Sequence, residues 1–496
     1  MRSSARWAAI AAGFAAAAAA YLAVRQAGRT RGATAGPVSS STRAARTLAL
    51  ARIGGSAGAG FAAHRVRTAL AGDDEVRKAE LAAAFELRTA EQVAEALGGM
   101  KGALMKVGQM ASYLDQGLPQ PVRDALAQLQ ADAPPMAAPL ARSTIEADLG
   151  RPLRDLFADF DDDPLASASI GQVHRAVLHD GRAVAVKVQY PGVDDAIKAD
   201  LANAGVLFHA VGMLFPGLEP GPIVDEIRSR VVEELDYEQE ARNQQLFVDA
   251  YADHPFIHVP AVVHDRSSRR VLTTELASGA RFDEARTWSQ AERDLAGEAI
   301  FRFVFRSLYR LRAFNGDPHP GNYLFRPGGQ VVFLDFGLVK HFEPAEVEVF
   351  SQMIRAMVLD RDVAAFRRVI ESVGLLPPGA PFDDQLVEDY FGHFYEFVLD
   401  RGPVTMTREY ASESVRRIFD SSGEYGELMR MANLPPSFVI IQRINMGLYA
   451  VLAELGATAD WRSIAEELWP WVGAPPSTPL GEAEAEWARS TRSAAS

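Results

Sequence analysis

The sequence predicts an α+β fold with two lobes, a small sheet-rich lobe followed by a larger, mainly helical one. Two hairpins support this prediction. The first pairs residues 175–178 with residues 183–188 across a His-Asp-Gly turn. The second pairs residues 323–325 with residues 331–334 across an Arg-Pro-Gly-Gly turn. Between the hairpins, residues 223–251 have the apolar spacing of a helix.

The strongest chemical signal surrounds the second hairpin. Asp317 and Asn322 stand five residues apart, and Asp335 opens an Asp-Phe-Gly triplet directly after the second strand. Kinase catalytic loops place a base and a metal-holding amide at this spacing, and an Asp-Phe-Gly aspartate holds magnesium against the ATP phosphates. We therefore expect a kinase-like site in which Asp317 is the base, and Asn322 and Asp335 bind Mg²⁺. Taken singly, these fragments also suit ordinary turns.

A strand lysine and a helix glutamate complete this pattern. Lys187 ends Val184-Ala-Val-Lys187 on the first hairpin, and lysine is scarce here, with six among the 51 basic residues. A retained lysine indicates a need for a compact ammonium, which would contact the α- and β-phosphates of ATP. Glu240 is the expected partner of Lys187. A solvated lysine at a strand end is the alternative.

The helix that carries Glu240 has further acidic residues. At about 100° per residue, Glu234 and Glu240 lie on different faces, whereas Asp236 and Glu240 share a face. Two separate partners are therefore expected, although an acidic run is also typical of a solvated helix face.

An alanine-rich segment stands where kinases have a glycine-rich loop. It contains one glycine, Gly171, so we expect a stiffer loop with fewer close backbone approaches to phosphates. After the strands at 258–263 and 270–275, Glu275 to Ala277 would form the hinge facing adenine. The residues expected to bind nucleotide in the loop are Ala166, Ser167, Ala168, Ser169, Ile170, Gly171, Gln172 and Val173.

Together these motifs resemble the UbiB-type family of atypical kinases, which is associated with isoprenoid-quinone (coenzyme Q) biosynthesis. The match runs from about residue 81 to residue 455. It includes the family's KxGQ signature, here Lys106, Gly108 and Gln109, and its ExD motif, here Glu234 and Asp236. The resemblance implies that the KxGQ helices cover the site where a protein substrate would bind, with Lys106 meeting Glu234. It also implies an ATP-binding ATPase or small-molecule kinase with poor protein kinase activity in trans.

The chain departs from the family pattern in three places. Ser167 replaces an alanine, and Asn315-Gly316 replaces the His-Ala that commonly precedes the catalytic aspartate. The second change removes an orienting histidine and weakens the assignment of Asp317 as base. The membrane-spanning tail of some bacterial members is missing, and the composition of residues 474–496 predicts a disordered end.

The charge distribution separates a basic arm from an acidic body. Residues 1–72 contain ten arginines and no acidic residue, while the whole chain has a net charge of −13. An acidic body disfavours nucleic acid as a partner, and a basic arm favours an anionic surface. The absence of cysteine excludes a disulfide framework, a thiolate nucleophile and Cys-ligated zinc.

Residues 7–24 form an uncharged run of 18 residues, 11 of them alanine, with arginines on both sides. As a helix this run would be about 27 Å long, close to the roughly 30 Å core of a bilayer. A single transmembrane anchor, a cleaved signal and an alanine-rich tail remain open. An ATP-using domain needs the cytosolic nucleotide pool, so we favour an anchor with the catalytic domain on the cytoplasmic side. Residues 42–70 could lie on the membrane surface.

The predicted organisation has five parts: a basic region (1–72), a helical KxGQ extension (73–135), a kinase-like N-lobe (136–280), a C-lobe (281–473) and a tail (474–496). The predicted function is a membrane-associated, Mg²⁺-dependent ATPase or kinase. It would use ATP and support isoprenoid-quinone or related lipid metabolism, with a membrane lipid, a quinone precursor or quinone-synthesis enzymes as partners. The alternatives are a nucleotide-gated scaffold without phosphoryl transfer and a soluble, aminoglycoside-type phosphotransferase.

Overall fold

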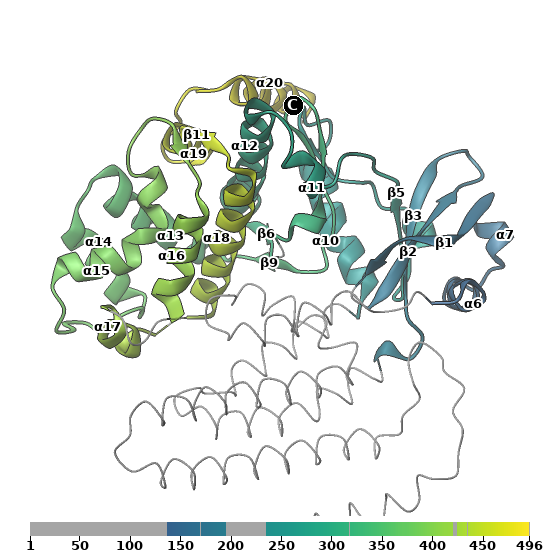
Figure 1. Ribbon diagram of the computed structural model, residues 1–496, viewed down its shortest axis with the longest axis horizontal. Coiled ribbons are helices and arrows are strands. Elements are labelled where there is room, and N and C mark those ends of the chain that lie inside the picture. Colours follow the sequence, from purple (N-terminus) through teal and green to yellow (C-terminus); the bar gives the residue numbers. More distant parts are fainter. Residues whose placement is uncertain are drawn as a thin grey trace, which may run out of the picture. The chain divides into compact units, whose positions relative to one another are not determined.

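The computed structural model (Figure 1) describes residues 136–168, 170–194, 235–316, 318–419, 424–433 and 435–495. The chain divides into two compact units, which are considered separately. One unit combines Met1–Ala147, Asp162–His174 and Lys187–Leu235, and the other combines Asp148–Asp161, Arg175–Val186 and Asp236–Ser496. The predictions for residues 1–135, including the arm, the 7–24 segment and the KxGQ motif, lie outside the described residues. So do Ser169, Glu234 and Asp317.

A four-stranded sheet follows the short helices α6 (Ala138–Leu149) and α7 (Leu153–Leu156). Its strands are β1 (Asp159–Ala168), β2 (Gly171–Val177), β3 (Ala183–Gln189) and β5 (Val271–Glu275), in the order β1-β2-β3-β5. The predicted first hairpin is confirmed as β2 and β3. Its turn closes through the Leu178 amide, which donates to the Arg182 carbonyl, and through Gly181 at a φ of 89°. Only glycine adopts that backbone readily.

Gly171 is required by the spacing of β2 and β3. A Cβ atom at this position would lie 2.1 Å from the carbonyl oxygen of Val188. No side chain fits such an approach, so the single glycine of the alanine-rich segment serves strand pairing. The alanine-rich segment is also less of a loop than predicted, because β1 extends to Ala168.

Helix α10 (Tyr237–Ala250) begins at Tyr237, and residues 223–234 of the predicted helical stretch lie outside the described residues. Asp236 is its N-cap, because the Asp236 carboxylate accepts hydrogen bonds from the amides of Glu238 and Gln239. The prediction that Asp236 shares a helix face with Glu240 is therefore wrong. A capping aspartate satisfies amides that have no partner within the helix, and this favours a helix start here.

Residues 258–263 were predicted as a strand of the small lobe, and this is only half correct. β4 (Ile257–His258) instead pairs in parallel with β8 (Gln330–Phe333), which in turn pairs antiparallel with β7 (Tyr323–Arg326). Val262 keeps a bridge to Thr274 of β5. Residues of this segment thus pair in two different sheets. An apolar run in the sequence does not show which of its residues pair in which sheet.

The remaining residues are mainly helical, as predicted. The helices are α11 (Phe282–Ala285), α12 (Gln290–Arg306), α13 (Pro344–Ile354), α14 (Val363–Ser372), α15 (Asp384–Phe391), α16 (Arg408–Phe419), α17 (Gly426–Met431), α18 (Pro436–Leu455), α19 (Trp461–Leu468) and α20 (Pro479–Ala495). Shorter elements are η2 (His264–Arg266), η3 (Ser307–Leu311), η4 (Pro320–Asn322), η5 (Arg355–Leu359), η6 (Gly392–Val398), β6 (Ala313–Asn315), β9 (Val339–His341), β10 (Val404–Thr405) and β11 (Thr458–Ala459). Among the described helices, none is long and apolar enough to cross a bilayer.

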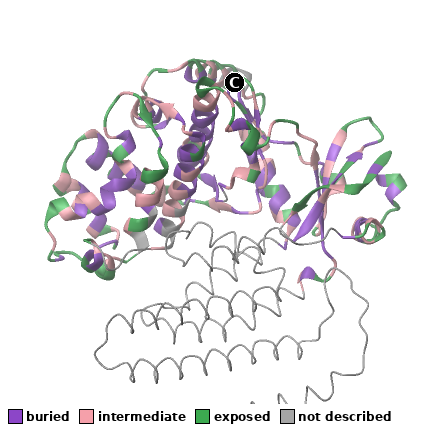
Figure 2. Ribbon diagram, in the orientation of Figure 1, coloured by how far each residue is buried: buried purple, intermediate pink, exposed green. Residues whose placement is uncertain are grey.

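Helix α12 is the centre of the helical part. Residues 296–304 are all buried along it, as the purple ribbon in Figure 2 shows. Phe303 of α12 stacks on Phe333 of β8 with ring centroids 3.7 Å apart. This packing ties the helices to the hairpin, so the position of the loop between them is set by the core.

The predicted disorder of residues 474–496 is wrong for the described part, because residues 479–495 form helix α20. Glu484 of this helix is buried and accepts a hydrogen bond from the Arg302 guanidinium of α12 at 2.9 Å. The composition suggested disorder because α20 has few apolar residues. A buried ion pair anchors it instead.

Candidate functional site

The β7–β8 hairpin places Asn322 and Asp335 close together at its open end. Tyr323 pairs with Phe333, and the amide of Leu334 donates to the carbonyl of Asn322 at 2.8 Å. The next residue is Asp335, so the predicted pair flanks the open end of the hairpin. A side-chain amide and a carboxylate are oxygen ligands that Mg²⁺ accepts, together with phosphate oxygens. The residues present thus fit the predicted metal.

Asp335 has an unusual backbone conformation that its neighbours hold in place. Its φ is 63°, in the left-handed region that aspartate tolerates better than most residues. Its Oδ1 accepts from the Gly337 amide at 3.1 Å, and its carbonyl accepts from the Asn315 side chain at 2.7 Å. Strained residues that persist in this way are concentrated at functional sites.

The next residue, Phe336, anchors the triplet in the core. Its side chain is fully buried, with its ring 4.9 Å from that of Phe247 on α10. Its carbonyl accepts from Asn243 of the same helix at 3.0 Å. Helix α10 therefore fixes the Asp-Phe-Gly segment from one side, and β6 fixes it from the other.

Asn315 is a positioning residue that sequence reasoning missed. Its replacement of a histidine was interpreted as the loss of an orienting group. In the structure Asn315 is buried on β6, pairs with Val339 of β9, and orients Asp335 through the hydrogen bond described above. The sequence did contain a clue, because an asparagine stands directly before the predicted catalytic loop. A buried side-chain amide normally has a hydrogen-bond partner, so a bond to a neighbouring segment could have been expected.

Glu240 of α10 lies beside the same triplet. A Cβ atom at Gly337 would lie 3.6 Å from Glu240 Oε2 and 3.3 Å from Asp335 Oδ1. Both carboxylates thus face one small space, and Glu240 is buried. Glu240 is therefore close to the Asp-Phe-Gly triplet that contains the predicted metal ligand Asp335.

The predicted catalytic loop is held by hydrogen bonds before and after Asp317. Before it, the Gly316 amide donates to the Leu338 carbonyl at 2.7 Å. After it, His319 Nδ1 accepts from the Gly321 amide at 3.0 Å and caps the turn that leads to Asn322. His319 is thus a loop hydrogen-bonding residue.

The nucleotide-binding predictions remain predictions, with two refinements. Lys187 lies on β3, in the other compact unit from Glu240. Ile170 and Gln172 are buried, and the Gln172 side chain accepts a hydrogen bond from the Met136 amide at 2.8 Å, in the segment before α6. Among the described loop residues, Ala166 and Ser167 are exposed at the end of β1.

The hinge prediction has a structural basis in β5. Glu275 ends this strand, and the next amide, that of Leu276, donates to the Ala183 carbonyl at 3.1 Å. The Glu275 carboxylate lies 3.2 Å from His258 Nε2. Residues 276–279 then have no regular secondary structure, and the hinge stays a prediction.

Comparisons with known proteins agree with this geometry. Residues 128–370 match the ABC1 atypical kinase-like domain. The rat protein named "Atypical kinase COQ8B, mitochondrial" is 31% identical over 386 residues, which cover 76% of this chain and 71% of the rat protein. The mouse "AarF domain-containing protein kinase 1" is 36% identical over 261 residues, which cover 51% of this chain and 49% of the mouse protein.

A solved structure is also similar. It is "The complex structure of Rv3197-erythromycin from Mycobacterium tuberculosis", and it matches with a TM-score of 0.60 and 33% identity over 80% of this chain and 100% of that chain. Fold and site therefore define a kinase-like protein of mixed α+β structure. The chain belongs to the ABC1, or UbiB-type, family of atypical kinases. The predicted family and fold class are confirmed.

Proposed function

We propose that this protein is an Mg²⁺-dependent ATPase or small-molecule kinase that acts at a membrane in isoprenoid-quinone or related lipid metabolism. The observation that carries the proposal is the position of Asn322 and Asp335 at one end of the β7–β8 hairpin, with Asp335 held by Asn315. A protein that only bound other proteins would not need a strained carboxylate positioned in this way. Membership of the UbiB-type family supports the link to quinone metabolism.

The residues would divide the chemistry among them. Asn322 and Asp335 would supply oxygen ligands, and bound Mg²⁺ would neutralise charge on the phosphate oxygens. Asn315 and Asn243 hold the backbone by donating to the carbonyls of Asp335 and Phe336, respectively. Lys187 is proposed to bind the α- and β-phosphates. Asp317 is proposed to accept the proton of the attacking hydroxyl or water.

The proposed partners follow from charge and family. ATP is the nucleotide, and a membrane lipid or isoprenoid-quinone precursor is the proposed acceptor or effector. Quinone-synthesis enzymes are proposed protein partners, and nucleic acid is not. Residues 1–72 contain ten arginines and no acidic residue, and this charge favours binding to an anionic bilayer. The catalytic domain is proposed to lie on the cytoplasmic side.

Phosphate release with and without anionic vesicles tests the membrane role. We expect vesicles to raise the ATPase rate of the full chain, and added salt to reduce the gain because it screens the arginines. Deletion of residues 1–72 should abolish the gain and leave the basal rate, since the motifs lie further along the chain. Equal rates with and without vesicles at low salt would contradict the membrane role.

A second candidate function is antibiotic binding. It is favoured by the similar M. tuberculosis protein, whose structure is that of a complex with erythromycin. Erythromycin and an aminoglycoside therefore belong in the same phosphate-release assay as alternative effectors. Strong stimulation by either one, with indifference to vesicles, would replace the lipid proposal. Nucleotide binding without any phosphate release would instead favour the scaffold alternative.

Gly447→Ala is expected to reduce phosphate release by roughly a hundredfold, because small displacements of a catalytic loop can cost that much. A Cβ atom at Gly447 of α18 would lie 2.1 Å from Cγ of Pro318, which follows Asp317 directly. Either the helix or the loop must move. Pro318→Ala removes the clashing ring carbon, so the double variant should recover part of the lost activity. A single variant with the wild-type rate would show that α18 does not position the loop.

A further inference from the structure

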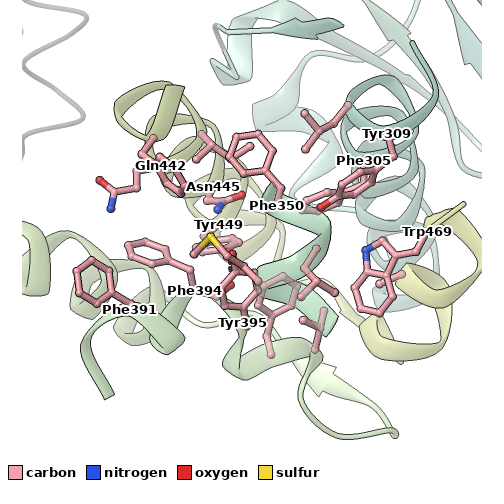
Figure 3. Close-up of a pocket in the computed structure, with 18 of the residues that line it drawn as sticks. Phe305, Tyr309, Phe350, Phe391, Phe394, Tyr395, Gln442, Asn445, Tyr449 and Trp469 are labelled. Carbon is pink, nitrogen blue, oxygen red and sulfur yellow. Dashed lines mark hydrogen bonds between the residues drawn. The ribbon is translucent and has the colours of Figure 1, made fainter. Parts of the chain in front are cut away.

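The aromatic cavity in the helical part (Figure 3) has a volume of about 60 Å³, and none of the residues that line it is charged. A cavity that holds benzene has roughly 150 Å³, so this space is too small for a ring compound. The buried groups that the proposed chemistry leaves unused lie instead around helix α20 and the start of β4.

His254, which stands between α10 and β4, is the central one of these groups. Its side chain is 0% exposed. Its Nδ1 accepts a hydrogen bond from the amide of Ile257, the first residue of β4, at 3.1 Å. A ring nitrogen that accepts from an N–H group carries no proton itself, so the proton of the neutral ring is on Nε2. The hydrogen bond therefore holds both the neutral form of His254 and the start of β4 in place.

Helix α20 covers the other side of this ring. His254 Nε2 lies 3.7 Å from Oε1 of Glu484 and has no hydrogen-bond partner within the described part of the chain. The ring of Trp487 packs edge to face on the imidazole, with centroids 4.4 Å apart, and its Nε1 donates to the Ala252 carbonyl at 2.9 Å. Helix α20 and the segment that leads into β4 thus share one buried imidazole.

The charges that face His254 come from α12 and α20. Arg302 and Arg306 pair with Glu484 at 2.9 and 3.1 Å. The ring of Tyr251, a further titratable neighbour, lies 5.5 Å from the imidazole. Burial lowers the pKa of His254, the two arginines lower it further, and Glu484 opposes them only in part. A charged imidazole is therefore disfavoured while α20 is docked.

Protonation of His254 is incompatible with this arrangement. The added proton goes to Nδ1, where it faces the N–H of Ile257, and two donors cannot share a hydrogen bond. The ring can reach water only if Trp487 and Glu484 move away from it. Glu484 itself stays ionised near neutral pH: burial would raise its pKa, but His254 and the two α12 arginines lower it to about 2.

We propose that α20 is a proton-sensitive latch, which holds the start of β4 while His254 is neutral and is released when His254 takes up a proton. Ile257 of β4 pairs with Val331 of β8, the strand that leads to Asp335. Release of α20 therefore loosens the end of the hairpin that carries the predicted metal ligand. The latch needs no nucleotide, so the proposal stands or falls separately from the proposed function.

The direction of the pH effect follows from the lowered pKa of His254. With α20 released, His254 takes up its proton near the usual value of 6.5, whereas with α20 docked it does so only at lower pH. Release is therefore favoured as the pH falls below about 6.5, by up to about tenfold per pH unit, and docking is fully favoured above that value.

Hydrogen–deuterium exchange of the full chain, from about pH 7.5 to about pH 5.5, tests the latch because it measures local opening. After correction for the effect of pH on the chemical exchange rate, the amides of α20 and of residues 254–258 should lose protection together below about pH 6.5. His254→Asn should remove this pH dependence, because its side-chain oxygen can accept from the Ile257 amide but does not titrate. His264→Asn makes the same change at an exposed histidine and should leave the dependence unchanged.

Glu484→Gln provides a second measurement, which also decides the case if His254→Asn does not fold. It removes the charge that Arg302 and Arg306 hold, so α20 should open more at every pH, while the dependence on pH remains. The proposal is overturned if the protection of α20 in the wild-type protein does not change between the two pH values. It is equally overturned if folded His254→Asn keeps the pH dependence, or if Glu484→Gln loses it.

Discussion

Asp335→Asn is expected to abolish Mg²⁺-dependent ATP hydrolysis and to remove the stabilisation that Mg²⁺ and ATP together give the wild-type protein. The reason is the loss of the charge that would hold the cation at the end of the β7–β8 hairpin. At a nucleotide concentration about 100 times the Kd, binding to the wild-type protein should add about 2.7 kcal/mol to its stability. A thermal-shift titration with Mg²⁺ and ATP measures this directly.

The same substitution at Asp253 is a matched control. Asp253 is exposed and has a φ of 54°, so it shares the left-handed backbone of Asp335 without lying at the site. Asparagine tolerates that conformation, so neither variant should be strained by its backbone. Asp253→Asn should keep the full Mg²⁺–ATP stabilisation. If Asp335→Asn kept it as well, Asp335 would not be a metal ligand.

The second hairpin and the Asp-Phe-Gly triplet could be predicted because their signals are local. Alternating apolar residues on both sides of an Arg-Pro-Gly-Gly turn predict β7 and β8, whatever surrounds them. Asn322 and Asp335 are adjacent to the ends of these strands in the sequence, so the hairpin alone brings them together.

The features that sequence reasoning missed depend on contacts between distant segments. The hydrogen bond from Asn243 to Phe336 joins residues 93 positions apart, and the one from Asn315 to Asp335 joins residues 20 positions apart. β4 could not be assigned to the β8 sheet, because its apolar pattern suits either sheet. Asp236 was predicted to lie within a helix. In an acidic run, the sequence alone does not distinguish an aspartate that caps a helix from one inside the helix.

Helix α20 is a further case, because its anchor is a charge cluster and not an apolar face. The Arg302 guanidinium is 1% exposed and binds three carboxylates, from Glu298 at 2.7 Å, Glu467 at 2.8 Å and Glu484 at 2.9 Å. These residues come from α12, α19 and α20. A polar, alanine-rich sequence contains no apolar stripe that would reveal such docking.

Arg302→Met is therefore expected to destabilise the protein by about 3–5 kcal/mol, because it leaves buried carboxylates without their shared cation. Urea denaturation at pH 7 measures the loss. Arg361→Met is the matched control, because the Arg361 side chain is 47% exposed and pairs with Asp400 at 2.8 Å on the surface. Exposed pairs contribute about 0–1 kcal/mol, so the control should change little.

The pH dependence of this loss distinguishes a charge effect from a packing effect. Burial by itself would raise the pKa of Glu484, but the neighbouring His254, Arg306 and Arg302 outweigh it and lower the pKa to about 2. A depressed carboxyl pKa gives stability that is present above the unfolded-state value of 4.5 and is lost as the pH falls toward 2. In Arg302→Met this pKa rises, so protonation relieves the unpaired charge. The difference between wild type and variant should therefore shrink from pH 7 to pH 4, whereas a difference that stays constant would assign the role of Arg302 to packing alone.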